Sequence, residues 1–321
     1  MKINSRLPDL ICCPICKAKL DLTNDNYVVC IDNRCKSRFP AIDGVPILIN
    51  DSTSVFSIKQ FVDKENKLQK LDNKSMIYKL WQILPKPEIS ANIKAKINYP
   101  KFAKLLTNST PNPKVLILGS GEIGAGLKTI INDPSIEFIE TDVGLASRVV
   151  VVCDAHELPF SNETFDGVII QAVLEHTCDP YQCVKEICRV LKPDGLVYAE
   201  TPFMQQVHIG RYDFTRFTHL GHLRLFRQFD VIDDGAVCGT GMALAWSYQG
   251  FLLSFVKSKW ARALITLFTC YTAFWLKYFD YFLIDKPGTL DAASGYYLLG
   301  RKSQKTLSDK QLINLYRGIQ Q

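Results

Sequence analysis

Four cysteines near the N-terminus have the spacing of a metal site. They form two close pairs, Cys13 with Cys16 and Cys30 with Cys35. Two pairs of thiolates on separate turns can close a tetrahedral Zn²⁺ site with no open position, which marks a structural metal. Cys12 is an alternative ligand, but it is Cys13 that precedes the proline of a CPxC turn. A segment this small has too little hydrophobic core to fold unaided. We therefore expect zinc binding to supply much of its folding free energy.

A glycine-rich turn follows the first apolar run in the middle of the chain. The run covers residues 115–118, and its glycines are Gly119, Gly121, Gly124 and Gly126. Because an apolar-periodic segment comes next, the pattern predicts a strand that feeds a loop and a helix, where a ligand can approach backbone N–H groups. The letters GSGEIG also satisfy a dinucleotide fingerprint, so the turn alone does not identify its ligand.

Acidic side chains end the next two apolar runs. Glu140 and Asp142 close the second run, and Asp154 closes the third, VVVVCD. A fourth run, FDGVIIQAVLEH, opens into a helix that ends RVLKPDG. Ligands of open α/β sheets bind outside the carboxyl ends of the strands, where the strand order switches. We therefore expect a cofactor site at these strand ends.

The alternation of short apolar runs with helical segments predicts an α/β fold, with a parallel sheet covered by helices on both faces. Strands are expected near residues 115–118, 136–141, 148–152, 165–171, 195–201 and 231–237, and a late strand at 296–302.

The ordered series over residues 112–203 resembles the class I S-adenosylmethionine-dependent methyltransferases, in particular the type 11-like group whose core reads DAxxLPF, FDxV, LEH and RVLKPGG. The resemblance implies a Rossmann-like, doubly wound sheet of seven strands in which YYLLGRK is inserted antiparallel. It also implies S-adenosylmethionine as the cofactor.

The resemblance assigns cofactor contacts to eight residues, Gly119, Gly121, Glu140, Asp142, Asp154, Ala155, Gln171 and Ala172. The backbone of the two glycines would pass under the methionyl part. Asp142 would accept from the ribose hydroxyls, with Glu140 as the alternative, because two acceptor oxygens suit a vicinal diol. Asp154 would meet the adenine amino group beside the Ala155 backbone, and its alternative role is a cap of the following turn. The last two residues would lie beside the sulfonium.

The chain departs from the family pattern at two places. Ile117 stands where the family has an acid, and Ile123 stands at the third glycine, with Gly124 one place late. These departures keep open a second class of function, a non-catalytic partner or scaffold with a degenerate cofactor site.

The loop after the fifth strand carries candidate acceptor residues. Methyl transfer is an in-line displacement that needs alignment and no nucleophile, and a base only where the acceptor must lose a proton. The candidate bases are His176 and His208, each with a purely structural alternative. Arg211, Asp213 and Arg216 resemble part of a subgroup signature, PF-x-x-x-x-H…DYxRFT. The arginines could bind an anionic acceptor, or pair with Asp213 or Glu200 to hold the loop shut.

The segment SRFPAIDGVPILI after the cysteines resembles the zinc-ribbon module that serves some tRNA and release-factor methyltransferases as a separate activating subunit. Here the module is fused in cis. We predict a zinc ribbon at residues 1–50, a lysine-rich helical linker at 51–111, and the methyltransferase domain at 112–321. Apolar residues at Phe56, Phe61, Leu68, Leu71, Ile77, Leu80 and Trp81 suggest short amphipathic helices in the linker.

The composition and charge of the chain indicate which classes of partner it could bind. The 321 residues are 47% hydrophobic and 22% charged, with a net charge of +6 that comes from the N-terminal third. A basic stretch can meet RNA, an anionic membrane or an acidic substrate, although a solvated linker is the commoner case. An RNA methyltransferase is the alternative function; its weakness is that aromatic residues are not interleaved with the basic ones. We expect no DNA partner. Eleven cysteines without an apolar leader indicate reduced thiols and a cytoplasmic chain.

Residues 240–285 form a hydrophobic, predicted helical segment that is too diluted and interrupted to span a bilayer. We expect helices that cover the pocket, with a peripheral membrane contact through aromatic residues as the alternative. The sequence thus predicts methyl transfer to a small-molecule or lipid-linked acceptor, a glycan among them.

Overall fold

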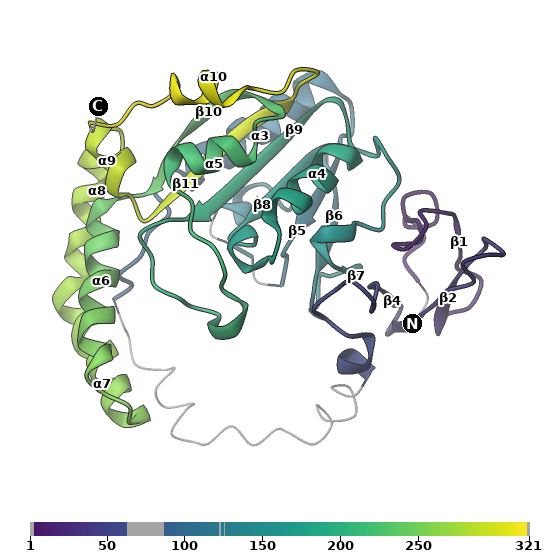
Figure 1. Cartoon of the computed structure of the whole chain (residues 1–321), viewed down its shortest axis with the longest axis horizontal. Helices are drawn as coiled ribbons and strands as arrows, with labels where there is room; N and C mark the ends of the chain where they lie inside the picture. Colours follow the sequence, from purple (N-terminus) through teal and green to yellow (C-terminus); the bar gives the residue numbers. More distant parts are fainter. Residues whose placement is uncertain (1–2, 63–86, 122, 125, 320–321) are drawn as a thin grey trace.

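The computed structural model describes residues 3–62, 87–121, 123–124 and 126–319. Their strands form one eleven-stranded sheet in the order β1-β2-β3-β4-β7-β6-β5-β8-β9-β11-β10 (Figure 1). The strands are β1 (Leu20–Asp21), β2 (Tyr27–Cys30), β3 (Arg38–Ile42), β4 (Val45–Leu48), β5 (Lys114–Leu118), β6 (Glu137–Asp142), β7 (Val151–Cys153), β8 (Phe165–Gln171), β9 (Leu191–Pro202), β10 (Phe229–Cys238) and β11 (Gly295–Lys302).

The seven strands from β5 onward confirm the predicted fold class. β7, β6, β5, β8 and β9 are parallel, and β11 runs antiparallel between β9 and β10. β5 pairs with β6 on one side and with β8 on the other, so the strand order reverses there. Open α/β sheets bind their ligands at such a reversal.

The N-terminal segment continues this sheet. β1 to β4 are joined antiparallel, and β4 then pairs in parallel with β7, Ile47 opposite Val152 and Leu48 opposite Cys153. This pairing places the residues after β4 beside the carboxyl end of β7. The boundaries predicted for the zinc ribbon, linker and methyltransferase domain stay a prediction.

Helices cover both faces of the sheet (Figure 1). On one face, α3 (Ala95–Ser109) buries Tyr99 and Phe102 in a cluster with side chains of β5 and β9. On the other face lie α4 (Pro180–Val190) and α5 (His219–Leu225). α4 begins where the Asp179 side chain accepts from the Gln182 N–H, with Pro180 in the first turn, both of which favour a helix start.

Two connections at the site edge are shorter than a helix. Between residues 126 and 131 the structure has one 3₁₀ turn, η1 (Leu127–Thr129), where the sequence pattern predicted a helix. A turn around Asp133 and Pro134 follows at once, which leaves no length for more. The link from β6 to β7 has no helix either. In the linker, the predicted apolar positions Leu68 to Trp81 lie outside the described residues.

A group of helices lies between β10 and β11 in the sequence. It comprises α6 (Thr240–Ser254), α7 (Lys259–Ala273), the turn η5 (Phe274–Leu276), α8 (Lys277–Leu283) and α9 (Pro287–Ala292), and the short α10 (Asp309–Ile313) comes after β11. Figure 1 shows α6, α7 and α8 side by side at the edge of the molecule opposite β1 and β2. In the part of the chain that the structure describes, no helix has the length and apolarity to cross a membrane.

Candidate functional site

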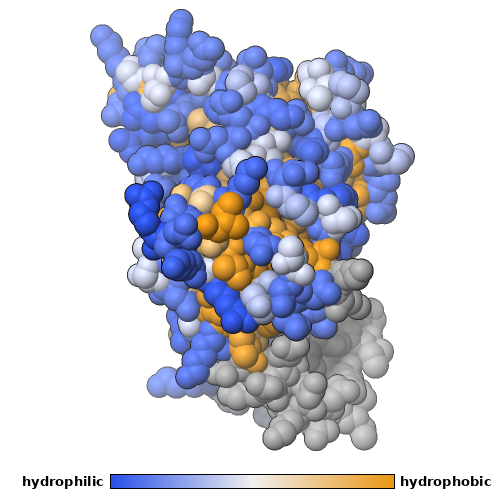
Figure 2. Space-filling view, turned by 90° about the vertical axis from the view of Figure 1, so that its right-hand side faces the viewer, coloured by the Kyte–Doolittle hydropathy of each residue, from blue (hydrophilic) through white to orange (hydrophobic). Residues whose placement is uncertain are grey.

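The four predicted zinc ligands come together. All four Sγ atoms lie within 4.8 Å of one another, with Cys13 3.8 Å from Cys35 and Cys16 3.4 Å from Cys30. A tetrahedral site with Zn–S bonds of about 2.3 Å requires sulfur atoms about 3.8 Å apart, so the cluster fits a structural zinc ion. The surface around this segment is mostly hydrophilic with one apolar patch (Figure 2).

The glycine turn is tied to the end of β6. Gly119 has φ +79°, and a Cβ there would collide with the Val173 side chain, so this position requires glycine. Its N–H and that of Ser120 donate to the Thr141 carbonyl oxygen, and the Gly121 N–H donates to Oδ2 of Asp142 (2.8 Å). The turn therefore lies against the carboxyl edge of β6, as predicted.

The two candidate ribose acids have different surroundings. Glu140 is buried and pairs with Arg148, which donates from Nε (2.8 Å) and from Nη2 (2.7 Å). Among the described residues, Asp142 accepts hydrogen bonds only from backbone N–H groups, those of Gly121 and Gly144 (2.8 Å each). The geometry favours Asp142 over Glu140, because the Glu140 oxygens are already held by a charged donor.

Asp154 is enclosed by partners. It caps the 3₁₀ turn η2 (Ala155–Glu157), accepting from the His156 N–H (3.0 Å), and it also contacts His156 Nδ1 (2.6 Å) and Ser54 Oγ (2.5 Å). Burial raises the pKa of Asp154, but the hydrogen bonds outweigh burial and lower it overall. The cap role and the predicted adenine role are compatible, since Oδ2 retains a lone pair.

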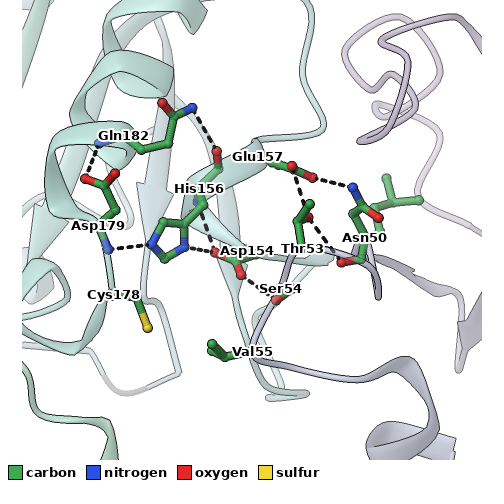
Figure 3. A pocket seen from close by; sticks show the side chains of 11 residues that line it. Asn50, Thr53, Ser54, Val55, Asp154, His156, Glu157, Cys178, Asp179 and Gln182 are labelled. Atoms are coloured by element: carbon green, nitrogen blue, oxygen red, sulfur yellow. Dashed lines mark hydrogen bonds and ion pairs between the residues drawn. The ribbon is translucent and has the colours of Figure 1, made fainter.

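A pocket of about 330 Å³ lies beside Asp154 (Figure 3). One wall is the core, with Asp154 to Glu157 and Cys178 to Gln182, and the other is the segment after β4, residues 48–55. Asn50 Nδ2 and Thr53 Oγ1 donate to the two oxygens of Glu157 (2.9 Å and 3.0 Å). This wall has no signal in the sequence, because only the pairing of β4 with β7 brings residues a hundred positions apart into contact.

The end of β8 is held by β9. Gln171 Nε2 donates to Oε2 of Glu200 (2.7 Å), which also accepts from Asn92 (2.9 Å). Burial raises the pKa of Glu200, and three side-chain hydrogen bonds oppose that rise. Ala172 has φ +52°, a left-handed backbone conformation that is costly for a residue with a Cβ and that concentrates at functional sites.

The two histidine candidates meet beside this strand end. His176 lies in the turn η3 (Leu174–His176) and His208 in the loop after β9, and their Nε2 atoms are 3.0 Å apart. The neighbouring Glu175 is completely buried, and neither of its carboxyl oxygens has a hydrogen-bond partner among the described residues. Burial raises the pKa of Glu175 to about 8 and lowers that of His176. Glu175 was not predicted as a site residue, because nothing in LEH shows which way its side chain points.

The loop residues take two different arrangements. Arg216 pairs with Asp213 through both guanidinium nitrogens, and it also donates to the carbonyl oxygens of Gln205 (2.9 Å) and Gln206 (3.2 Å). This is the alternative in which the arginine holds the loop shut. Arg211, in the turn η4 (Gly210–Tyr212), is exposed and its guanidinium lies 4.9 Å from the Tyr212 ring. Of these two arginines, only Arg211 is open to a ligand.

Two kinds of known protein are similar to parts of this chain. Residues 123–199 match the family model described as a methyltransferase domain. The chain is 26% identical over 149 residues to a ubiquinone/menaquinone biosynthesis C-methyltransferase, UbiE, of Geotalea daltonii, covering 41% of this chain and 60% of that protein. It is 30% identical over 77 residues to a demethylmenaquinone methyltransferase of Clavibacter sepedonicus, covering 24% of this chain and 26% of that protein. The chain therefore spans less than two thirds of these two relatives.

For the second kind of relative, the match covers the whole length of the relative. The chain is 31% identical over 65 residues to a UPF0434 protein of Azotobacter vinelandii, 19% of this chain and all of that protein.

Among solved structures, a putative sarcosine dimethylglycine methyltransferase from Galdieria sulphuraria aligns with a TM-score of 0.42 at 16% identity, over 71% of this chain and 98% of that one.

Proposed function

Because the chain belongs to the class I S-adenosylmethionine-dependent methyltransferases and, over a stretch of 65 residues, to the UPF0434 family, we propose that it transfers a methyl group to a small-molecule or lipid-linked acceptor, glycan-bearing lipids among them. The observation that carries the proposal is the contact of the glycine turn with Asp142 at the end of β6, next to the strand-order reversal at β5. Asp154 follows the neighbouring strand β7 at the same edge of the sheet.

In this proposal the cofactor lies across that edge. The Gly119 and Gly121 backbone faces the methionyl part, Asp142 accepts from the ribose hydroxyls, and Asp154 accepts from the adenine amino group beside the Ala155 backbone. Gln171 and Ala172 flank the sulfonium, and the φ of +52° at Ala172 supports a position where the backbone approaches a ligand. The four cysteines would hold a zinc ion that cross-links the N-terminal turns and takes no part in transfer.

Methyl transfer depends mainly on the alignment of the two bound reactants, and less on a reactive side chain. The acceptor atom attacks the methyl carbon in line with the departing sulfur, and aligning two bound reactants while excluding water lowers the barrier by several kcal/mol, on the order of 7 or more in favourable cases. His208 is the candidate base, since its ring is partly exposed beside the end of β8. Arg211 is the candidate contact for an anionic group of the acceptor.

Two observations favour a lipid-linked acceptor. The relatives with quinone names, UbiE and the demethylmenaquinone methyltransferase, are named for lipid-soluble compounds. In this chain, large apolar side chains of the C-terminal helices are exposed, among them Phe255 (72%) and Phe282 (73%). We propose that the exposed aromatic side chains of these helices, Phe255 and Phe282 among them, make a peripheral contact with a membrane.

Calorimetry with S-adenosylmethionine tests the cofactor site. We expect the wild-type chain to bind it and Asp142→Asn to bind at least 10-fold more weakly, because a hydrogen bond to a charged group contributes about 1.5–3 kcal/mol. Glu140→Gln is the matched control, which should lose stability through Arg148 but retain the cofactor. Absence of binding by the wild-type chain would overturn the proposal.

Sedimentation with vesicles tests the membrane contact. Phe255→Ser with Phe282→Ser should weaken the affinity for vesicles with anionic lipid about 100-fold or more, because each buried phenyl ring contributes about 1.5–3 kcal/mol and about 1.4 kcal/mol is a factor of ten. Phe214→Ser, an exposed phenylalanine in the loop after β9, is the control. Equal binding of all variants would refute the contact while leaving the cofactor site intact.

A further inference from the structure

Three ligand-type side chains converge outside the cysteine cluster. Nε2 of His176 lies 3.0 Å from Nε2 of His208, and Oε1 of Glu175 lies 3.6 Å from the first and 3.9 Å from the second. The three atoms all fall within 4.8 Å of one another. They come from two segments, the turn after β8 and the loop after β9, so the fold itself brings them together.

Hydrogen bonds on the far side of both rings fix which nitrogen carries a proton. Nδ1 of His176 lies 2.8 Å from the carbonyl oxygen of Tyr212, and a carbonyl only accepts, so this nitrogen is the donor. Nδ1 of His208 lies 3.4 Å from Oδ2 of Asp213, which likewise favours the proton there. In neutral rings, the lone pairs are then on the two Nε2 atoms, which face each other. Metal-binding histidines are oriented in this way by an outer carbonyl or carboxylate.

The Glu175 carboxyl group has no cationic partner in this environment unless one of the two histidines takes up a proton. Its side chain is 0% exposed, and both oxygens lack a hydrogen-bond partner among the described residues. The nearby cation, Arg216, is occupied by Asp213 and by carbonyl oxygens. An unpaired buried carboxylate is costly, and this one points at two nitrogen lone pairs.

We propose that Glu175, His176 and His208 bind one divalent first-row transition-metal ion. A cation between the three atoms satisfies the carboxylate and separates the two lone pairs at once. A proton shared by the rings would also place a positive charge 3.6–3.9 Å from Oε1 of Glu175, so the experiment below distinguishes that arrangement from a metal ion.

The distances and ligand types suit such an ion. Bonds of about 2.0–2.1 Å place neighbouring ligands about 2.9 Å apart in an octahedron and about 3.4 Å apart in a tetrahedron. The observed 3.0–3.9 Å needs only small side-chain rotations to reach these values. Two imidazoles with one carboxylate favour zinc, iron, cobalt or manganese over magnesium and calcium, which prefer all-oxygen sites. Three ligands leave coordination positions open.

The open positions would bind an oxygen of the acceptor, a role that rests on the proposed methyl transfer. With its Nε2 lone pair on the ion, His208 is no longer available as a base, and a hydroxyl bound to the divalent ion loses its proton to water instead. The oxygen then forms its bond to the methyl carbon while the carbon–sulfur bond breaks, which leaves the methylated acceptor and S-adenosylhomocysteine. The ion would thus select acceptors with a hydroxyl group over those with only apolar reacting atoms.

Cobalt binding tests the site without any acceptor. The full chain, with its cysteine site loaded with zinc, is titrated with Co²⁺ by calorimetry and by visible absorption. We expect one further Co²⁺ per chain, with weak ligand-field bands and no thiolate charge-transfer band. Glu175→Gln and His208→Ala should each lower the affinity about 100-fold, and Glu163→Gln, an exposed glutamate elsewhere, should leave it unchanged.

Two readouts keep the result interpretable. A melting temperature close to that of the wild-type chain shows that a variant is folded, and His208→Ala alters a partly exposed ring if Glu175→Gln does not fold. No cobalt beyond the cysteine site, or equal affinity in all variants, would overturn the metal site in favour of a proton-bridged histidine pair. S-adenosylmethionine binding by the same samples separates this failure from a failure of the proposed function.

Discussion

Ser54 Oγ donates a 2.5 Å hydrogen bond to Oδ2 of Asp154, a residue one hundred positions later in the chain. The contact joins the segment after β4 to the acid that we assign to the adenine group. The neighbouring Asn50 and Thr53 bind Glu157 in the same way, so the N-terminal segment is a wall of the pocket in Figure 3.

Ser54→Ala should therefore destabilise the chain. Removing a hydroxyl that donates to a charged carboxylate costs about 1.5–3 kcal/mol. Urea denaturation would measure this loss as a lower midpoint at unchanged slope. Ser57→Ala, a nearby serine outside the pocket lining, is the control. An unchanged midpoint for Ser54→Ala would mean that the contact contributes nothing to stability.

Loss of the zinc ion should also weaken cofactor binding. Cys16→Ala leaves three thiolates, so the N-terminal turns should lose their metal, and the pairing of β4 with β7 should weaken. We expect less than one zinc ion per chain, a melting temperature lower by on the order of 10 °C, and weaker S-adenosylmethionine binding. Metal analysis and calorimetry measure the three effects. Cys12→Ala should keep its zinc, and a loss there would identify Cys12 as a ligand instead.

The two loop arginines should respond differently to replacement by lysine. Arg216→Lys keeps the charge but loses the paired contacts with Asp213, because lysine cannot donate through a planar fork. Hydrogen exchange in residues 203–216 should then rise at least 10-fold. Arg211→Lys should leave exchange unchanged, and its effect should fall on KM for an anionic acceptor. The same exchange rates in both variants would contradict the holding role of Arg216.

The buried His222 should make the chain sensitive to acid. Burial, and then the nearby His219, lower the pKa of His222 to about 3, and only Asp234 opposes them. Its unfolded pKa is about 6.5, so the unfolded chain takes up the proton first and stability falls as pH drops from 6.5 toward 3. The loss approaches about 1.4 kcal/mol for each pH unit in this window.

Urea denaturation at pH 7.5, 6 and 5 measures this dependence. His222→Gln should flatten the slope below pH 6.5 by about one proton, whatever the variant loses in absolute stability. Above pH 7 the two chains should show parallel curves. Equal slopes below pH 6.5 would assign the acid sensitivity to other groups.

The sequence predicted what depends on neighbouring residues. Strands β5 to β9 and β11 come from local apolar runs, whereas β10 carries three aspartates. The turn at Gly119 is marked by the glycine that its φ requires. The cysteine pairs were predictable for the same reason, since two short turns present their sulfur atoms. The roles assigned to Asp142, Asp154 and the histidines stay predictions.

What was missed depends on contacts between distant segments. The pairing of β4 with β7 has no local signal, because both strands are short apolar runs that could pair elsewhere. The unpaired carboxylate of Glu175 also has none, because its environment comes from the loop 203–218. Arg216 could be predicted to pair with Asp213 or to bind a ligand, and only the fold distinguishes the two.

The pairing of β4 with β7 also determines where the sheet ends. Without it, the Val-Val-Cys strand β7 would be an open, apolar edge, which is a template for association with another chain. With it, the outermost strand on that side is β1, only two residues long. The opposite edge, β10, is interrupted by two bulges and carries Asp230, Asp233 and Asp234. Both margins thus discourage aggregation, and a chain that lacks residues 1–50 should lose that protection on one side.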